Sequence, residues 1–82
     1  MNINQITELN DETTGVIDDI FNYHPWDEQK VQKGKKVREA LANAIKIIVE
    51  NVPPSPDRST AIRKIREARM DCNSAITFDG KY

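Results

Sequence analysis

Pro53-Pro54 stands between two long stretches of helical periodicity, and this pair limits the possible folds of the chain more than any other feature. Proline lacks the backbone N–H that a helix interior needs, and its ring clashes with the preceding turn, so no helix continues through the pair. Two residues that start helices follow. Ser55 has a side chain that caps helix N-termini, and Pro56 is favoured at the first helical position. The sequence therefore predicts one helix over residues 27–51 and a second over residues 56–76.

Each of the two stretches carries one apolar stripe at the spacing of an α-helix. The second stripe contains several alanines, which allow two helix axes to approach closely. Two long helices joined by a short proline-rich turn form an antiparallel αα-hairpin, so the expected fold class is all-α. The stripes consist of Val31, Val37, Leu41, Ala44, Ile45, Ile48 and Val52 in the first helix, and of Ala61, Ile65, Ala68, Cys72 and Ala75 in the second.

A shorter amphipathic helix is expected before the hairpin, over about residues 11–22. Thr13 or Asp11 is the expected N-cap, since both side chains can accept a hydrogen bond from a backbone N–H of the first turn. Gly15 weakens this helix by ~1 kcal/mol relative to alanine. The apolar positions of the helix are Val16, Ile17, Ile20 and Phe21.

The size and composition of the chain indicate one small domain that associates with copies of itself. Residues 1–9 are expected to be flexible, and residues 10–82 to form a single helical domain. A chain of 82 residues with 38% apolar residues is close to the size at which a single core becomes insufficient. Because Cys72 is the only cysteine, neither an internal disulfide nor a cysteine zinc site can compensate. We therefore expect a homo-oligomer. The absence of a membrane-span pattern and of a signal-peptide pattern favours the cytoplasm.

The charges are distributed unevenly along the chain, although the net charge is only −1. Residues 1–29 hold seven acids and no Lys or Arg, whereas residues 30–82 hold all 12 basic residues. Such asymmetry indicates an anionic partner for the basic part, or an acidic segment that folds over it. Polymeric nucleic acid requires a broad positive surface, so a small anion fits the charge better.

Asn22-Tyr23-His24-Pro25 forms a corner ahead of the basic stretch. Pro25 fixes its own φ and keeps His24 out of the α region, so an aromatic ring lies on a defined turn. A flat ring beside cations suits a phosphorylated ligand that carries a base. Tyr23 as a half-buried anchor is the alternative, and composition alone favours it. The basic stretch, for which a solvated face is the alternative, consists of Lys30, Lys33, Lys35, Lys36 and Arg38.

Three further features of the chain have two interpretations each. Trp26 could fasten the start of the following helix, and Gly34 could mark a place where another group packs closely. Arg66, Arg69, Asn73 and Thr77 share one flank of the last helix, where they could line an interface between protomers or form an ordinary boundary row.

The chain is not expected to be an enzyme, because it contains no nucleophile–base pattern, no glycine-rich phosphate loop and no metal-ligand spacing. His24, the only histidine, is favoured as a turn residue whose ring bonds to the backbone. No cofactor is expected.

The order of these features resembles the phage anti-CBASS cyclic-nucleotide sponges, a family that shares its hairpin domain with the anti-Thoeris sponges. The resemblance covers residues 18–77 and leaves the acidic first 17 residues outside. It lies in Phe21-Asn22-Tyr23-His24-Pro25, Lys36-Val37-Arg38-Glu39-Ala40, Val52-Pro53 with Ser55, Ser59-Thr60-Ala61-Ile62, Arg69-Met70 and Asn73-Ser74-Ala75-Ile76.

The resemblance implies a homohexamer in the host bacterial cytoplasm that sequesters cyclic oligonucleotide messengers of host defence without cleaving them. It places a cyclic dinucleotide, such as cGAMP, between two protomers. Tyr23, His24 and Pro25 of the corner would bind this ligand, with Tyr23 stacked on a base, and Lys36 or Arg38 would meet phosphate. A separate cyclic trinucleotide pocket would use polar residues of the last helix, namely Arg69, Asn73 and Thr77.

The chain departs from this family at two places. Many relatives have Met-Trp-Ala-Asn where this chain has Met70-Asp71-Cys72-Asn73, and Ile-Ala-Arg where it has Ile76-Thr77-Phe78. The missing arginine bears on the trinucleotide pocket more than on the dinucleotide pocket. The alternatives are a sponge for a cyclic ADP-ribose isomer, as in the anti-Thoeris proteins, and a helical protein-interaction adaptor. A helix pair that binds nucleic acid is a weaker alternative.

Overall fold

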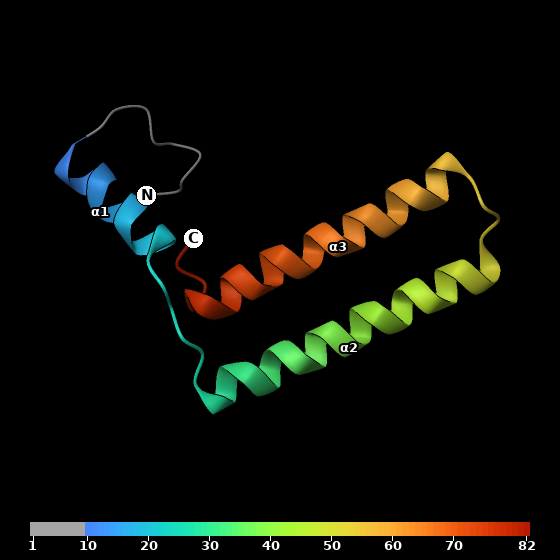
Figure 1. Cartoon of the computed structure of the whole chain (residues 1–82), viewed down its shortest axis with the longest axis horizontal. Coiled ribbons are helices and arrows are strands. Elements are labelled where there is room, and N and C mark those ends of the chain that lie inside the picture. The colour runs from blue at the N-terminus through green and yellow to red at the C-terminus, as the bar shows by residue number, and fades with distance from the viewer. Residues whose placement is uncertain (1–9) are drawn as a thin grey trace.

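The computed structural model describes residues 10–82, and in this range the chain is all-helical. It contains α1 (Asp11–Phe21), α2 (Glu28–Asn51) and α3 (Pro56–Thr77). Helices α2 and α3 run antiparallel along one another as a hairpin, and α1 lies apart at its open end, near the C-terminus (Figure 1). The structure thus confirms the all-α hairpin and the three predicted helices, with boundaries that differ by one residue at most. Residues 1–9, expected to be flexible, lie outside the described residues.

Side-chain caps set the start of each helix. Ser55 accepts a hydrogen bond from the backbone N–H of Arg58 at 3.1 Å, with Pro56 in the first turn, which confirms the predicted start of α3. Asp27 caps α2 in the same way, 2.8 Å from the N–H of Lys30. The predicted cap of α1 is wrong. Asn10, and neither Thr13 nor Asp11, accepts the hydrogen bond, because the helix begins directly after the asparagine.

A glycine-containing turn ends α3 and directs the chain back toward α1. Asp79 has φ 53° and Gly80 has φ 76°, both in the left-handed region. The N–H of Gly80 donates to the carbonyl of Ala75 at 2.9 Å, and the N–H of Asp79 donates to that of Ile76 at 3.4 Å. This is the Schellman arrangement, which satisfies carbonyls at a helix end and reverses the chain.

A joint between the start of α2 and the end of α3 holds the hairpin at its open end. The indole N–H of Trp26 donates to the hydroxyl of Thr77 at 2.7 Å. The ammonium of Lys30 donates to the carbonyl of Thr77 at 3.0 Å, where the helix dipole favours a cation. A Cβ on Gly34 would lie 2.7 Å from ring carbon Cη2 of Trp26 and closer still to Cζ3. The close approach expected at Gly34 and the fastening role of Trp26 are confirmed.

The protein buries little of its apolar surface within one copy. Among residues 10–82 no apolar side chain is fully buried, and Thr13 is the buried polar one. The radius of gyration is 16.5 Å, against ~12 Å for a compact domain of this length. The accessible surface is 6577 Å², against ~5,000 Å² for a folded monomer of this mass. One copy therefore exposes more surface than a compact domain of its mass, and several large apolar side chains are among the exposed groups. None of the three helices is both long and apolar enough to span a bilayer.

Gly34→Ala should destabilise the protein, because the added methyl overlaps the Trp26 ring. Overpacking of this kind lowers the free energy of unfolding by about 1–3 kcal/mol, which outweighs the ~1 kcal/mol that alanine gains over glycine in a helix. Gly15→Ala is the matched control, because no described atom lies within 4 Å of a Cβ there. Urea unfolding followed by circular dichroism should show opposite shifts for the two variants. Equal stabilisation by both substitutions would contradict the close contact between Gly34 and the Trp26 ring.

Candidate functional site

Tyr23 lies fully outside the hairpin, on the non-helical corner between α1 and α2. Its side chain is 88% exposed, and the last residue of α1, Phe21, is 78% exposed. The alternative of a half-buried anchor is therefore wrong within a single copy. The ring is available to a ligand or to another protein surface.

His24 holds this corner against the end of α1. Its ring Nε2–H donates to the backbone carbonyl of Asp19, which confirms the predicted turn role. On its other side the ring packs edge-on against Phe78, with the centroids 4.8 Å apart. Both sides of the imidazole are thus occupied, so His24 positions the corner, and Tyr23 next to it presents the free ring.

Asp19 ties α1 to the segment that follows α3. Its carboxylate accepts hydrogen bonds from the hydroxyl of Tyr82 at 2.5 Å and from the ammonium of Lys81 at 3.0 Å. The Tyr82 ring packs on Phe78 at 5.2 Å. Hydrogen bonds from Tyr82 and Lys81 hold the pKa of the Asp19 carboxyl below its ordinary 3.8. The same hydrogen bonds raise the pKa of Lys81 above 10.5 and the pKa of Tyr82 above 10.0.

The residues after α3 form the tail, and their contact with Asp19 through Tyr82 and Lys81 was not predicted from the sequence. Asp19 and Tyr82 are 63 residues apart, and no local pattern pairs them. The signal that could have found this contact is Asp79-Gly80, because a left-handed turn after a helix folds the following aromatic residues back onto the structure.

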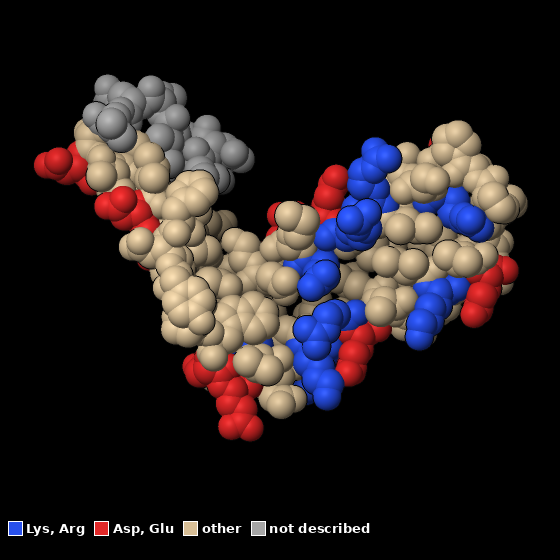
Figure 2. Space-filling model, in the orientation of Figure 1, with Lys and Arg blue, Asp and Glu red and all other residues tan. Residues whose placement is uncertain are grey.

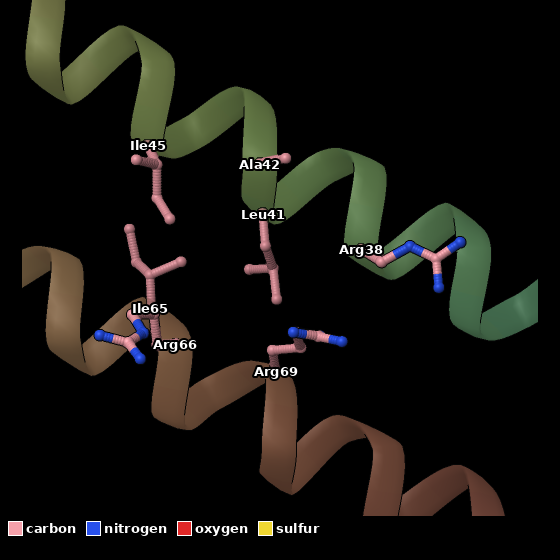
Figure 3. A pocket seen from close by; sticks show the side chains of 7 residues that line it. All are labelled: Arg38, Leu41, Ala42, Ile45, Ile65, Arg66 and Arg69. Atoms are coloured by element: carbon pink, nitrogen blue, oxygen red, sulfur yellow. The ribbon is translucent and has the colours of Figure 1, made fainter.

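A pocket of about 190 Å³ lies between α2 and α3, in the middle of the hairpin (Figure 3). Leu41, Ile45 and Ile65 project into the space between the helices and form an apolar floor. Three arginines lie around this floor, and none of the seven lining residues is acidic. We call this site the arginine groove. Its lining consists of Arg38, Leu41, Ala42 and Ile45 from α2, and of Ile65, Arg66 and Arg69 from α3.

The structure brings together residues that the sequence assigned to two different sites. Arg38 was predicted to meet a dinucleotide and Arg69 a trinucleotide, yet both line the arginine groove. Asn73 and Thr77 lie farther along α3, the latter ~12 Å from Arg69 at the rise of an α-helix. The hydroxyl of Thr77 accepts from Trp26 and donates to the carbonyl of Asn73 at 2.8 Å, so it serves the joint.

Tyr23 and the arginine groove lie far apart within one copy. Arg38 follows the first residue of α2 by ten positions, which corresponds to ~15 Å along the helix axis. Lys36 is exposed on α2 and does not line the groove. Tyr23 does not line the arginine groove of its own copy, and the two-protomer site that the resemblance implies stays a prediction.

The groove suits a flat ring that carries negative charge. A cavity of ~150 Å³ holds benzene, and sites for larger ligands measure ~300–1,000 Å³. One copy, with about 190 Å³, therefore accommodates a single ring. Guanidinium groups at its rim can donate paired hydrogen bonds to phosphate.

Two other kinds of site are less favoured in the described part of the chain. A second hollow of about 330 Å³ is lined by Asp71, Ser74, Ala75 and Tyr82, which include no cation that could meet a phosphate. Within residues 10–82, no three His, Cys, Asp or Glu side chains gather in a way that could hold a metal ion.

Comparisons of the chain with family models, with curated protein sequences and with solved structures find no match. The resemblance to the cyclic-nucleotide sponges stays a prediction. The function is therefore argued from the geometry of the corner and of the arginine groove.

The contact between α1 and the tail should depend on pH in the direction set by Asp19. Because the folded-state pKa of Asp19 is lowered, its contribution is present above pH 3.8 and is lost as the pH falls through the folded value. Lys81 and Tyr82 have raised pKa values, so their contributions are lost as the pH rises above about 10. The stability difference between wild type and Asp19→Asn, measured by urea unfolding, should be largest between these limits. A difference that persists unchanged at pH 2 would contradict the role of the carboxylate.

Proposed function

We propose that the protein binds cyclic oligonucleotides, foremost cyclic dinucleotides such as cGAMP, and sequesters them without cleaving them. The observation that carries this proposal is the arginine groove, in which three cations surround an apolar floor of the size of one ring. Such a site complements a ligand that combines flat bases with phosphates. Because the groove lining contains arginines and apolar residues but no acid, it provides groups that bind a phosphate and none that would serve as a general base.

The ligand would be held from two sides. The apolar floor and Tyr23 of a second copy would enclose a base, and Arg38, Arg66 and Arg69 would donate to its phosphates. Sequestration requires tight binding, since a Kd of 1 nM corresponds to about −12 kcal/mol. Stacking on Tyr23 would contribute ~1–3 kcal/mol for each base, and each hydrogen bond to a charged group ~1.5–3 kcal/mol.

A cyclic trinucleotide is the second ligand class of the proposal. Arg69 would serve it from the rim of the arginine groove, whereas Asn73 and Thr77 lie toward the joint. Because the hydroxyl of Thr77 is already bonded to Trp26, the geometry favours the dinucleotide. The single-ring size of the groove is equally compatible with one end of a larger cyclic ligand.

The biological setting of the proposal comes from the resemblance. On this proposal, the protein is encoded by a phage, assembles as a homohexamer in the host cytoplasm and blocks CBASS immunity. A sponge for a cyclic ADP-ribose isomer would use the same chemistry, since that ligand also joins a base to phosphates. The adaptor alternative draws on the exposed apolar side chains of α2, among them Ile47 and Val49. Neither a membrane nor polymeric nucleic acid is a partner in this proposal.

Loss of either half of the site should weaken dinucleotide binding. Tyr23→Ala and Arg69→Gln should each raise the Kd at least tenfold, because a stacked ring or a charge-assisted hydrogen bond is lost. Lys64→Gln is the matched control, since Lys64 is exposed on α3 and does not line the groove. Isothermal titration calorimetry with cGAMP measures the three affinities. Unchanged affinity in Tyr23→Ala would remove the ring from the site.

A panel of ligands separates the proposed function from its rivals. The protein is incubated with cyclic di- and trinucleotides and with cyclic ADP-ribose isomers, denatured by heat, and the released ligand is analysed by mass spectrometry. We expect a cyclic dinucleotide to be retained by the folded protein and recovered intact. Retention of the ADP-ribose isomer alone would support the sponge for cyclic ADP-ribose isomers. A degraded ligand would indicate an enzyme. If no ligand is retained, the protein-interaction adaptor is favoured.

A further inference from the structure

We propose that the outward face of α1 from one copy docks over the arginine groove of a second copy. This contact concerns the same groove as the proposed function, but it forms without a ligand and can be tested without one. We call residues 10–23 the acidic arm, because they include four acids and no Lys or Arg. The proposed occupant of the groove is thus the acidic arm of another copy of this chain.

The acidic arm presents a polar face and an aromatic end that are exposed and make no side-chain hydrogen bond or ring contact within residues 10–82. Asp11, Gly15 and Asp18 follow one another at i, i+4 and i+7, and all three are exposed. Phe21, three residues after Asp18, ends the helix with 78% of its side chain exposed. The opposite face, with Thr13 and Ile17, is the one turned inward.

Gly15 adds a second observation on the outward face. Within the described part of the chain, a Cβ at this position would meet open space. A glycine in a helix interior weakens the helix by ~1 kcal/mol relative to alanine, and no contact within residues 10–82 requires a glycine at this position. A glycine on an exposed helix face allows another helix to approach closely.

The arginine groove complements this face in charge and in size. Figure 2 shows basic side chains gathered over the middle of the hairpin and acidic ones on α1. Asp11 and Asp18 would meet Arg66 and Arg69, which have no acidic neighbour in the groove lining. The pocket of about 190 Å³ exceeds the ~150 Å³ that holds one benzene ring, so it accommodates the ring of Phe21.

The arm that fills the groove must come from another copy. The arm of the same copy is held at the open end of the hairpin, where Asp19 bonds to Tyr82 at 2.5 Å and to Lys81 at 3.0 Å. The groove lies ~12–15 Å away from that end along both helices. Figure 1 shows α1 separated from the middle of the hairpin.

One copy exposes more surface than a compact monomer of its mass, which leaves area for a contact of this kind. The accessible surface of 6577 Å² exceeds the value expected for a folded monomer of this mass by ~1,600 Å². A standard protein–protein interface buries about 1,600 Å² in total. The contact is heterologous, because arm and groove are different surfaces, so a closed ring or an open chain of copies results.

The docked arm also prepares the groove for a ligand. Phe21 occupies the floor in the free protein, and Tyr23 lies two residues further along the same arm. A base that enters the groove takes the place of the Phe21 ring, while Tyr23 of the same arm is at hand to stack on it. The groove is incomplete as a binding site without the second copy.

Charge exchange between two variants tests the contact. The arm variant carries Asp11→Lys and Asp18→Lys, and the groove variant carries Arg66→Glu and Arg69→Glu. Sedimentation equilibrium without ligand should show an association constant at least tenfold lower for each variant alone. The 1:1 mixture should recover association, because each reversed surface then meets its complement. A wild type that is monomeric at 100 µM, or a mixture that fails to recover while both variants are helical by circular dichroism, overturns the proposal.

Two controls separate the contact from a general effect of charge or of apolar surface. Glu39→Lys with Glu50→Lys makes the same change in net charge on exposed acids of α2 outside the groove lining, and it should leave association within twofold of wild type. Phe21→Ala should weaken association at least tenfold, more than Ile47→Ala, which removes a 51% exposed side chain outside the groove. Equal effects of the two alanine variants contradict docking by Phe21. Failure of these tests with cGAMP binding retained would overturn the docked arm alone, whereas intact association without cGAMP binding would overturn the proposed function alone.

Discussion

The hydrogen bond from Trp26 to Thr77 is the contact on which the arrangement of the hairpin depends. It fastens Trp26, two residues before α2, to the last residue of α3 at 2.7 Å, and Gly34 leaves the space in which the indole lies. Lys30 reinforces the joint at the carbonyl of Thr77. Two antiparallel helices of this length could slide or rotate against one another, and a bond at their open end restricts both movements. In the resulting arrangement, Arg38 of α2 and Arg69 of α3 line the same groove.

The helices could be predicted from the sequence because their limits are local. Pro53-Pro54 ends one helix and Ser55 begins the next through bonds within four residues. The arginine groove could not be predicted in the same way. Arg38 and Arg69 lie on different helices, and their meeting depends on how α2 and α3 are rotated about their axes, which an apolar stripe specifies only within a wide angle. The family resemblance assigned the two residues to separate sites, and the Asp19–Tyr82 contact was not predicted.

The distribution of exposed groups gives one account of the uneven charge along the chain. The acids of α1 and the cations of the hairpin do not neutralise one another within a copy, since the contacts of Asp19 go to the tail. Tyr23 is likewise exposed, and no side-chain hydrogen bond or ring contact is seen for it within residues 10–82. In the proposed assembly, copies would use the acidic segment, the aromatic corner and the basic groove together, and a small anionic ligand would balance the remaining positive charge of the groove.

The attachment of α1 to the tail divides the chain into two parts of unequal cooperativity. Helix α1 is held by hydrogen bonds to a partly exposed carboxylate and by aromatic edges, whereas the hairpin has the joint and a continuous stripe of side chains. Regions with few buried apolar contacts open without global unfolding. We therefore expect the amides of α1 to exchange with solvent more readily than those of the hairpin. An assembly built through α1 would then be able to exchange its copies without unfolding the hairpins.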